Sequence, residues 1–337
     1  MSTCISRRAL VAAAAASAFA PALLRAQPVV TMKLTSATIN DVIHHWMKSY
    51  KAGLEARTGG RIKVDLYPAS QLGAIPRMVE GAALGTIECF VTASSFLTSL
   101  DAKFEVLDVP GILGDTAHAR QVFADAEVRQ QLFAMGGSKG LQSISAFMHS
   151  PQHIVSRKPV RTLADLQGQK IRVLSTPMQI EPFKKLGAAP VPMPLSEVMP
   201  ALQNGAIDGF IAASTVFSAL KFYDAAKHQT ALPRWPVVVV AACNKAWLAK
   251  LPAELRTAVT EEAVRAEAAA NDFGAGDIQS ARAVWTQNGG QLLALGAPDE
   301  ATFLKTVQDS AMAILRDKPG LAAEYERYVR LAQKYKA

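Results

Sequence analysis

The stretch GQKIRV (residues 168–173), together with LGAAPVPMPLSEVMPALQNGAIDGF (residues 186–210), decides the fold of this chain. It places Arg172 near the end of an apolar strand, which a helix and a second strand ending in Asp208-Gly209 follow. This pattern is one αβ layer of an open sheet. A fixed cation then lies at the carboxyl end of a strand, where open α/β sheets bind their ligands.

The flanking sequence repeats the same alternation of strands and helices. Strands are predicted over 29–35, 61–67, 87–92, 141–148, 154–156 and 236–242, and helices over 41–57, 75–84, 116–135 and 252–288, with two more after 298. The β-α-β-α-β order at the start predicts a parallel, doubly wound sheet. The fold class is therefore α/β, with two such units forming a bilobed clamshell.

The two lobes are predicted to share the chain unevenly. Residues 27–149 with about 238–277 form domain I, and residues 150–237 with about 278–337 form domain II. The crossings near 149 and 237 carry no Gly/Ser linker, which favours strand hinges over independent domains. The long helix after Pro252 is expected to span both lobes and to bend near Gly274.

Composition indicates a globular chain with a sizeable core. Of the 337 residues, 50% are hydrophobic and 19% are charged, and the formal net charge is +8. Basic residues alternate with acidic ones along the chain, unlike the clustered stripes of nucleic-acid-binding proteins, so no nucleic-acid partner is expected. The positive balance modestly favours anionic ligands.

The N-terminus reads as a secretory signal peptide, residues 1–26. Arg7-Arg8 precede an apolar run over 9–24, and Ala26 offers a cleavage point. The run is short for a membrane span. Ser6-Arg7-Arg8 also fits a twin-arginine signal, so either export route is open. The mature chain is therefore expected to be exported, and Cys4 lies before the apolar run.

Two cysteines remain in the expected mature chain. Cys89 and Cys243 both lie in apolar, strand-like contexts, and buried free thiols are the favoured interpretation, with a disulfide as the alternative. No clustered His, Cys and Asp spacing is present, so neither a metal site nor a cofactor is predicted.

Several motifs occur in one order along the chain. They are LYPASQLG (66–73), EVLDVP (105–110), LADLQGQKIRV (163–173), LGAAPVPM (186–193), Ser196-Glu197 and Ile207-Asp208-Gly209. Together they closely resemble the dicarboxylate-binding type of solute receptor of TRAP (tripartite ATP-independent periplasmic) transporters, from about residue 30 to the C-terminus. The resemblance implies a bilobed, periplasmic-binding-protein-like (type II-like) fold and a periplasmic location. It also implies a receptor that closes around a small organic acid and delivers it to membrane permease subunits.

The resemblance also implies a role for Arg172. In the family, an arginine of the K-I-R-V strand forms a salt bridge with the ligand carboxylate. The planar guanidinium suits this role because it offers a carboxylate two parallel hydrogen bonds and stays charged. The alternative is an internal salt bridge between Arg172 and a carboxylate such as Asp208.

Two departures from the family pattern bear on the ligand. Many relatives carry a second arginine where this chain has Gln152, and a Glu and an Asn after the Asp-Gly step, where Ala212 follows here. One cation and one amide are thus absent from the expected pocket. A monocarboxylate with an apolar or aromatic remainder is favoured over a sugar acid or a small dicarboxylate, because unpaired buried polar groups are costly.

Further candidates for lining the pocket come from strand ends, loops and aromatic side chains. They are Gln71, Phe90, Thr92, Phe147, His149, Met193, Phe217 and Trp235. For each aromatic residue the alternative is packing in the core, and for His149 it is a structural hydrogen bond.

No catalytic residue is predicted. Gly136-Gly137-Ser138-Lys139-Gly140 fits G-x-S-x-G, but a helix precedes it and a strand follows, the reverse of a nucleophile elbow. The alternatives to a transport receptor are an exported binding protein that serves signalling and, less favoured, an exported α/β hydrolase.

Overall fold

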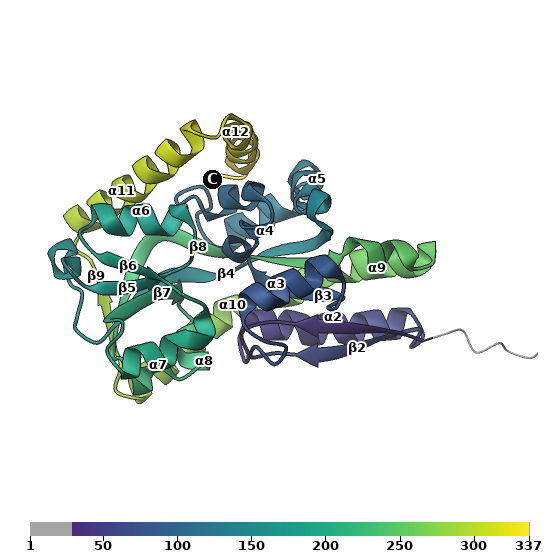
Figure 1. Cartoon of the computed structure of the whole chain (residues 1–337), viewed down its shortest axis with the longest axis horizontal. Coiled ribbons are helices and arrows are strands. Elements are labelled where there is room, and N and C mark those ends of the chain that lie inside the picture. The colour runs from purple at the N-terminus through teal and green to yellow at the C-terminus, as the bar shows by residue number, and fades with distance from the viewer. Residues whose placement is uncertain (1–28, 337) are drawn as a thin grey trace, which may run out of the picture.

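The computed structural model describes residues 29–336 as two α/β lobes that share one mixed sheet (Figure 1). This is the bilobed architecture that the sequence predicts. The expected signal peptide, residues 1–26, and Cys4 lie outside the described residues.

The first lobe is built on a parallel βαβαβ unit. Its elements are β1 (Val30–Thr35), α2 (Val42–Arg57), β2 (Ile62–Tyr67), α3 (Ile75–Leu84) and β3 (Cys89–Ala93). β1 lies between β2 and β3 and is parallel to both, as the strand–helix order predicts. The apolar side chains of α2 recur at helical spacing and lie buried against the sheet.

The second lobe contains the stretch around Arg172. Its elements are β5 (Lys170–Val173), α6 (Pro177–Lys185), β6 (Ala189–Pro192), α7 (Val198–Gln203) and β7 (Gly209–Ala213). β5 lies between β6 and β7 and is parallel to both. The prediction of a second strand that ends in Asp208-Gly209 was wrong. Gly209 is the first residue of β7, and a turn after α7 precedes it.

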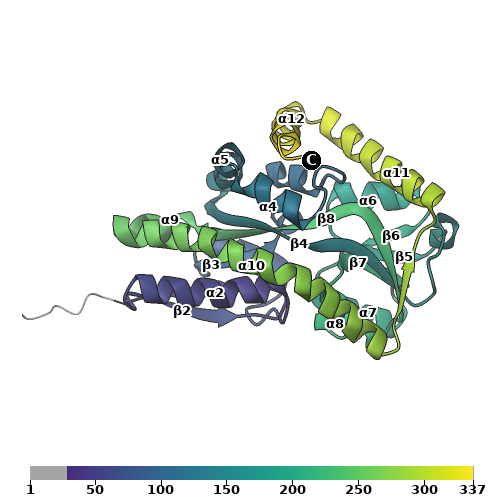
Figure 2. The ribbon, with the colours of Figure 1, turned by 180° about the vertical axis from the view of Figure 1, so that it is seen from behind.

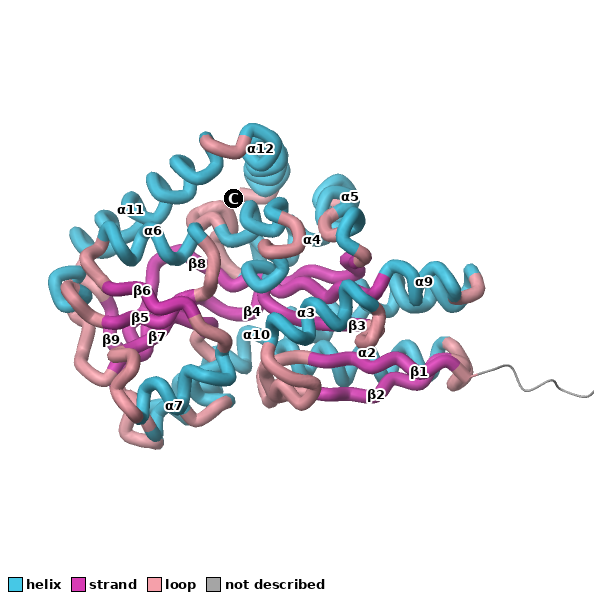
Figure 3. The backbone as a smooth tube through the Cα atoms, viewed as in Figure 1, coloured by secondary structure: helices cyan, strands magenta, loops and turns pink. Residues whose placement is uncertain are grey.

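Two long strands join the lobes. β4 (Leu141–Ser156) and β8 (His228–Asn244) pair antiparallel along most of their length and run through both halves of the sheet (Figure 3). The predicted strands 141–148 and 154–156 are thus one strand. The register shifts on both sides of the Pro151–Pro236 pair, where neither residue can donate a backbone hydrogen bond. The break in the ladder lies between the two halves of the sheet.

The helices outside the sheet differ in part from the prediction. The predicted helix 116–135 is two helices, α4 (Thr116–Ala124) and α5 (Ala126–Ala134). Asp125 between them is extended and accepts hydrogen bonds from the N–H groups of Glu127 and Val128, which ends one helix and begins the next. β9 (Gln291–Ala294) pairs parallel with β8 and was not predicted.

A single long helix lies across both lobes. α10 (Ala253–Gln287) follows the short helix α9 (Lys245–Lys250) and runs diagonally behind the sheet, from α2 to α8 (Val216–Ala219) (Figure 2). Gly53 allows α2 to approach it, since a Cβ there would lie 2.6 Å from Oε2 of Glu262.

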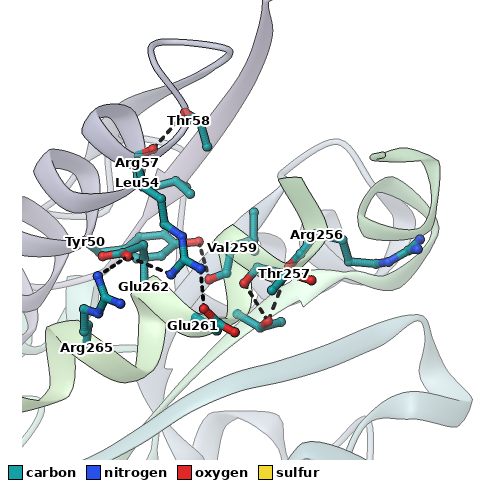
Figure 4. A network of polar contacts seen from close by, with 11 residues as sticks. Tyr50, Leu54, Arg57, Thr58, Arg256, Thr257, Val259, Glu261, Glu262 and Arg265 are labelled. Atoms are coloured by element: carbon teal, nitrogen blue, oxygen red, sulfur yellow. Dashed lines mark hydrogen bonds and ion pairs between the residues drawn. The ribbon is translucent and has the colours of Figure 1, made fainter. Parts of the chain in front are cut away.

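Polar contacts fix α10 to α2. Figure 4 shows Arg57 of α2 bonded to Glu261 and Glu262 of α10, and Tyr50 Oη donates to the carbonyl of Val259 at 3.2 Å. Arg265 also bonds Glu262, at 2.9 Å. These contacts hold the first half of α10 on the first lobe.

The chain ends with α11 (Ala297–Arg316) and α12 (Pro319–Gln333), the two predicted C-terminal helices. Side chains of α12, among them Leu321, Tyr328 and Leu331, belong to the hydrophobic cluster of the first lobe. The prediction grouped residues 278–337 with the second lobe. The residue boundaries of the two domains stay a prediction.

Glu267 of α10 anchors the helix to the shared sheet. Its side chain is buried, pairs with Arg129 of α5 at 2.7 Å, and accepts the N–H of Ala146 in β4 at 3.1 Å. We expect Glu267→Ala to lower the free energy of unfolding by about 2 kcal/mol or more, because a buried N–H and a partly buried guanidinium lose their partner.

Urea unfolding monitored by circular dichroism measures this change. The matched control is Asp272→Ala on the same helix, which removes an exposed ion pair with Arg120 and should leave the unfolding midpoint unchanged. Equal destabilisation by the two variants would contradict the anchoring role of Glu267.

Candidate functional site

A cavity of about 70 Å³ lies between the lobes, where strands from both lobes end. The carboxyl ends of β1, β3, β5 and β7 all reach it, as expected for an open α/β sheet. Most of its wall is apolar. The polar residues in the wall are Thr38, Thr92, Ser95, His149, Gln152, Arg172 and Gln179.

Arg172 is the only cationic arginine or lysine side chain among the described residues that line this cavity. It is 1% exposed, and two backbone carbonyls hold its guanidinium. Nε donates to the carbonyl oxygen of Met193 at 2.9 Å, and Nη1 donates to that of Ile211 at 3.3 Å. Nη2 is buried and has no hydrogen-bond partner. The Nη2 group of the guanidinium is therefore available to a hydrogen-bond acceptor in the cavity.

The charge of Arg172 lacks an internal counter-ion. Burial alone lowers the pKa of its guanidinium to about 9, and no carboxylate within the described part of the chain offsets that effect. Asp208, the alternative partner, accepts the backbone N–H of Lys170 at 2.8 Å instead. An isolated buried cation is costly, so an anion in the cavity would be strongly favoured.

Gln152 and Gln179 form an amide chain beside the guanidinium. Nε2 of Gln179 donates to Oε1 of Gln152 at 3.3 Å, and Oε1 of Gln179 accepts the N–H of Leu174 at 2.9 Å. Both side chains are almost fully buried. This chain orients the side chain of Gln152 in the wall of the cavity.

His149 connects the lobes at the strand crossing. Nε2 donates to Oδ2 of Asp41, the N-cap of α2, at 3.0 Å, and Nδ1 lies 3.3 Å from Oγ1 of Thr215 in the second lobe. Burial by itself would raise the pKa of Asp41, but hydrogen bonds from His149, Thr38 and the N–H of His44, together with the electrostatic effect of His149, hold that pKa below its usual range. His149 thus has a structural hydrogen bond and also lines the cavity.

Asp108 is a second buried, charged group near the cavity wall. Oδ1 accepts a hydrogen bond from Oγ of Ser94 at 3.3 Å, while Oδ2 has no partner. Its backbone carbonyl accepts the indole N–H of Trp235 at 2.8 Å. Burial raises the pKa of Asp108 to about 6, because nearby hydroxyl groups only partly compensate for the lost water.

The cavity contains five of the predicted binding residues: Thr92, His149, Gln152, Arg172 and Ala212. The other six do not line it. Phe90 and Phe147 pack in the core, Gln71 is exposed, and Phe217 packs edge-on against Phe210 with ring centroids 5.0 Å apart.

Met193 and Trp235 support the site without lining it. Met193 contributes its carbonyl to Arg172, and its side chain packs against the hydrophobic cluster of the second lobe. The ring of Trp235 packs against Phe303, and its indole N–H donates to the backbone carbonyl of Asp108. For the four aromatic candidates, core packing is thus the arrangement that the structure shows.

Sequence reasoning missed Thr38, Ser95 and Gln179. Thr38 and Ser95 lie in the segments that follow β1 and β3, and Gln179 lies in the first turn of α6 after β5. The rule that ligands bind at the carboxyl ends of strands would have identified them had it been applied to every strand and the turn after it. The side chain of Thr38 is buried and contributes to lowering the pKa of Asp41.

The G-x-S-x-G segment lies away from this cavity. Gly137–Lys139 form a turn of 3₁₀-helix between α5 and β4, and Gly136 and Gly140 on either side have φ of 78° and 81°. Within residues 29–336, no group of three His, Cys, Asp or Glu side chains could hold a metal ion. No helix in this range combines the length and apolarity that a membrane crossing needs.

Comparison with known proteins gives consistent results. Residues 35–316 match the family described as bacterial extracellular solute-binding protein, family 7. The 2,3-diketo-L-gulonate-binding periplasmic protein of Escherichia coli is 34% identical over 251 residues, which cover 74% of this chain and 76% of that protein.

Solved structures share the fold. A TRAP periplasmic solute-binding protein from Desulfovibrio salexigens with bound orotic acid superposes with a TM-score of 0.85 at 24% identity, over 91% of this chain and 99% of the other. One from Xanthobacter autotrophicus with bound β-D-galacturonate gives 0.83 at 23% identity, over 89% and 99%.

The raised pKa of Asp108 predicts a pH-dependent cost to stability. The folded-state pKa of about 6 exceeds the ordinary 3.8, so the folded state binds the proton more tightly than the unfolded state. The stabilisation of the folded state that comes from protonated Asp108 is complete below about pH 4 and is lost as the pH rises through 6. At neutral pH the ionised carboxylate costs up to about 3 kcal/mol.

We therefore expect the difference in melting temperature, Asp108→Asn minus native protein, to become more positive from pH 4 to pH 7. Differential scanning fluorimetry at each pH measures the difference. Asp309→Asn, which neutralises a surface carboxylate, controls for net charge alone. A difference that stays constant with pH would show that Asp108 does not titrate in this range.

Proposed function

Because this chain belongs to family 7 of the bacterial extracellular solute-binding proteins, we propose that it is an extracytoplasmic receptor that binds a small organic acid through Arg172 and delivers it to a TRAP-type transporter. Members of the family are periplasmic binding proteins rather than enzymes, bind small organic acids, and work with TRAP membrane permeases. The proposal places this chain in the periplasm, with permease subunits as its partners.

The observation that carries the proposal is the buried, unpaired guanidinium of Arg172. Its Nη2 atom has no partner, and burial lowers its pKa to about 9. A ligand carboxylate would supply both the missing hydrogen-bond acceptor and the missing negative charge. Two backbone carbonyls already fix the orientation of the fork, so little side-chain freedom would be lost on binding.

Both lobes contribute to the cavity. Thr38, Thr92 and Ser95 come from the first lobe, while Arg172 and Gln179 come from the second. A ligand that contacts both sides is bound fully only when the lobes are closed, so binding would shift an open–closed equilibrium toward the closed form.

The lining favours a monocarboxylate with an apolar or aromatic remainder. One cation faces the cavity, Gln152 offers a neutral amide, and Ala212 has no side chain able to hydrogen-bond a hydroxyl group. Aliphatic side chains, among them Ile43, Ile75 and Val216, and Phe96 make up much of the wall. A polyhydroxylated acid would leave several buried groups unpaired.

Solved structures of similar proteins contain acids of both kinds, since orotic acid is planar and β-D-galacturonate is a sugar acid. The largely apolar lining of the cavity supports a planar acid such as orotate over a sugar acid. The competing possibility is a sugar acid, such as the 2,3-diketo-L-gulonate of the Escherichia coli relative.

Isothermal titration calorimetry against a panel of acids tests the ligand class. We expect orotate, benzoate or a branched 2-oxo acid to bind more tightly than galacturonate, succinate or sialic acid. Tight binding of succinate or a sugar acid, without binding of the aromatic and branched monocarboxylates, would contradict the proposed class. Mass spectrometry of small molecules released from the purified protein by denaturation would identify the natural ligand.

Arg172→Gln tests the role of the guanidinium. The amide can still donate to a carbonyl but carries no charge, so we expect the best acid from the panel to bind at least roughly 30-fold more weakly, which corresponds to 2 kcal/mol or more. The melting temperature without ligand should fall by no more than a few degrees, because the substitution also removes a buried unpaired charge.

Lys170→Gln is the matched control, since Lys170 lies on the same strand but is exposed. It should leave the affinity unchanged. If Arg172→Gln kept the native dissociation constant, the proposed carboxylate contact would be wrong, whatever the ligand.

A further inference from the structure

Cys89 and Cys243 lie directly opposite each other on neighbouring strands. β3 and β8 pair antiparallel, and the two cysteines are partners in that register. Both are free thiols with fully buried side chains, and both belong to the same hydrophobic cluster, which also contains Tyr50, Val91 and Ala241. Their sulfur atoms therefore emerge on the same face of the sheet.

The hydrogen-bond pattern shows which kind of pair they form. The N–H of Asn244 donates to the carbonyl of Glu88 at 2.9 Å, one residue outside the cysteines on each strand. Such a bond flanks a non-hydrogen-bonded pair, in which opposing Cα atoms lie about 4.5 Å apart and side chains are closest. That separation lies at the short end of the range of about 4.4–6.8 Å that disulfides span.

We propose that Cys89 and Cys243 are a disulfide site that closes as the chain folds in an oxidising environment. The two thiols would exchange with a disulfide oxidant, either a small-molecule disulfide or a dithiol–disulfide oxidase. One S–S bond forms in the protein, the S–S bond of the oxidant is broken, and two electrons and two protons pass to the oxidant, which becomes a dithiol or a pair of thiols. No group of the binding cavity takes part.

Burial decides when the bond can form. Both side chains are fully buried, so an oxidant cannot reach them in the folded protein. Burial also raises the pKa of the Cys89 thiol well above its ordinary value, with Cys243 as a further contributor, so folded Cys89 contains little of the reactive thiolate. Oxidation therefore takes place before β3 and β8 are fully packed. Once formed, the bond lies inside the core and is protected from reductants.

The cross-link would fasten the strand that joins the lobes. β8 runs through both halves of the sheet, and Cys243 lies in its first-lobe half. Thr92, three residues after Cys89, and Val237, on the same strand as Cys243, both line the cavity. The bond closes a long loop of chain, which lowers the entropy of the unfolded state and should raise the melting temperature.

The test is refolding of the full chain from denaturant in a buffer of oxidised and reduced glutathione, followed by alkylation under denaturing conditions and tryptic mapping. We expect one disulfide-linked pair, peptide 78–103 joined to peptide 235–245. Recovery of both peptides alkylated or glutathionylated, or of either one linked to Cys4, would overturn the proposal.

Two controls keep the result interpretable. Cys89→Ser should leave Cys243 reactive after denaturation under every condition. The native protein should melt several degrees higher after oxidative refolding than in dithiothreitol, while the double variant Cys89→Ala/Cys243→Ala shows no such difference. A linked pair that lowered the melting temperature would mean that the bond forces the strands apart, and would also overturn the proposal. Ligand affinity through Arg172 is a separate property that none of these outcomes tests.

Discussion

The structure is organised around one charge that it does not neutralise. Arg172 lies almost fully buried between the lobes, and the carbonyl groups of Met193 and Ile211 fix its guanidinium without balancing its charge. A buried cation of this kind is stable only if the rest of the fold holds it in place. The second lobe does so by placing Arg172 on β5, the strand flanked by β6 and β7. Under the proposed function, a ligand anion in the cavity would offset this cost.

β4, β8 and α10 hold the two lobes in a defined relation. β4 and β8 cross between them, and Pro151 opposite Pro236 interrupts the ladder where the crossing takes place. A ladder with missing hydrogen bonds bends more easily than a regular one. α10 spans both lobes on the back of the sheet, and Glu267 ties it to β4. A weakened strand crossing and a continuous helix are compatible with a hinge that closes over the cavity.

Much of this arrangement could be predicted from the sequence, and the errors have local physical causes. The helix over 75–84 was predicted at its observed bounds because apolar periodicity, a proline near its start and Gly85 at its end agree. The single helix over 116–135 was wrong because Asp125 can serve as an N-cap as well as a helical residue. For β4, two strands were predicted where one is present, because irregular pairing around Pro151 is accommodated within a single strand.

The sequence by itself determined the alternation of strands and helices, the family to which the chain belongs, and the position of Arg172 at the end of a strand. These follow from local periodicity and from short motifs, which do not depend on distant contacts. Only the tertiary structure decided that Asp208 does not pair with Arg172, that Phe217 and Trp235 pack in the core, and that Cys89 lies opposite a cysteine far away in the chain. The physical reason is that partner choice depends on strand order and register, which join segments far apart in sequence and leave no local pattern.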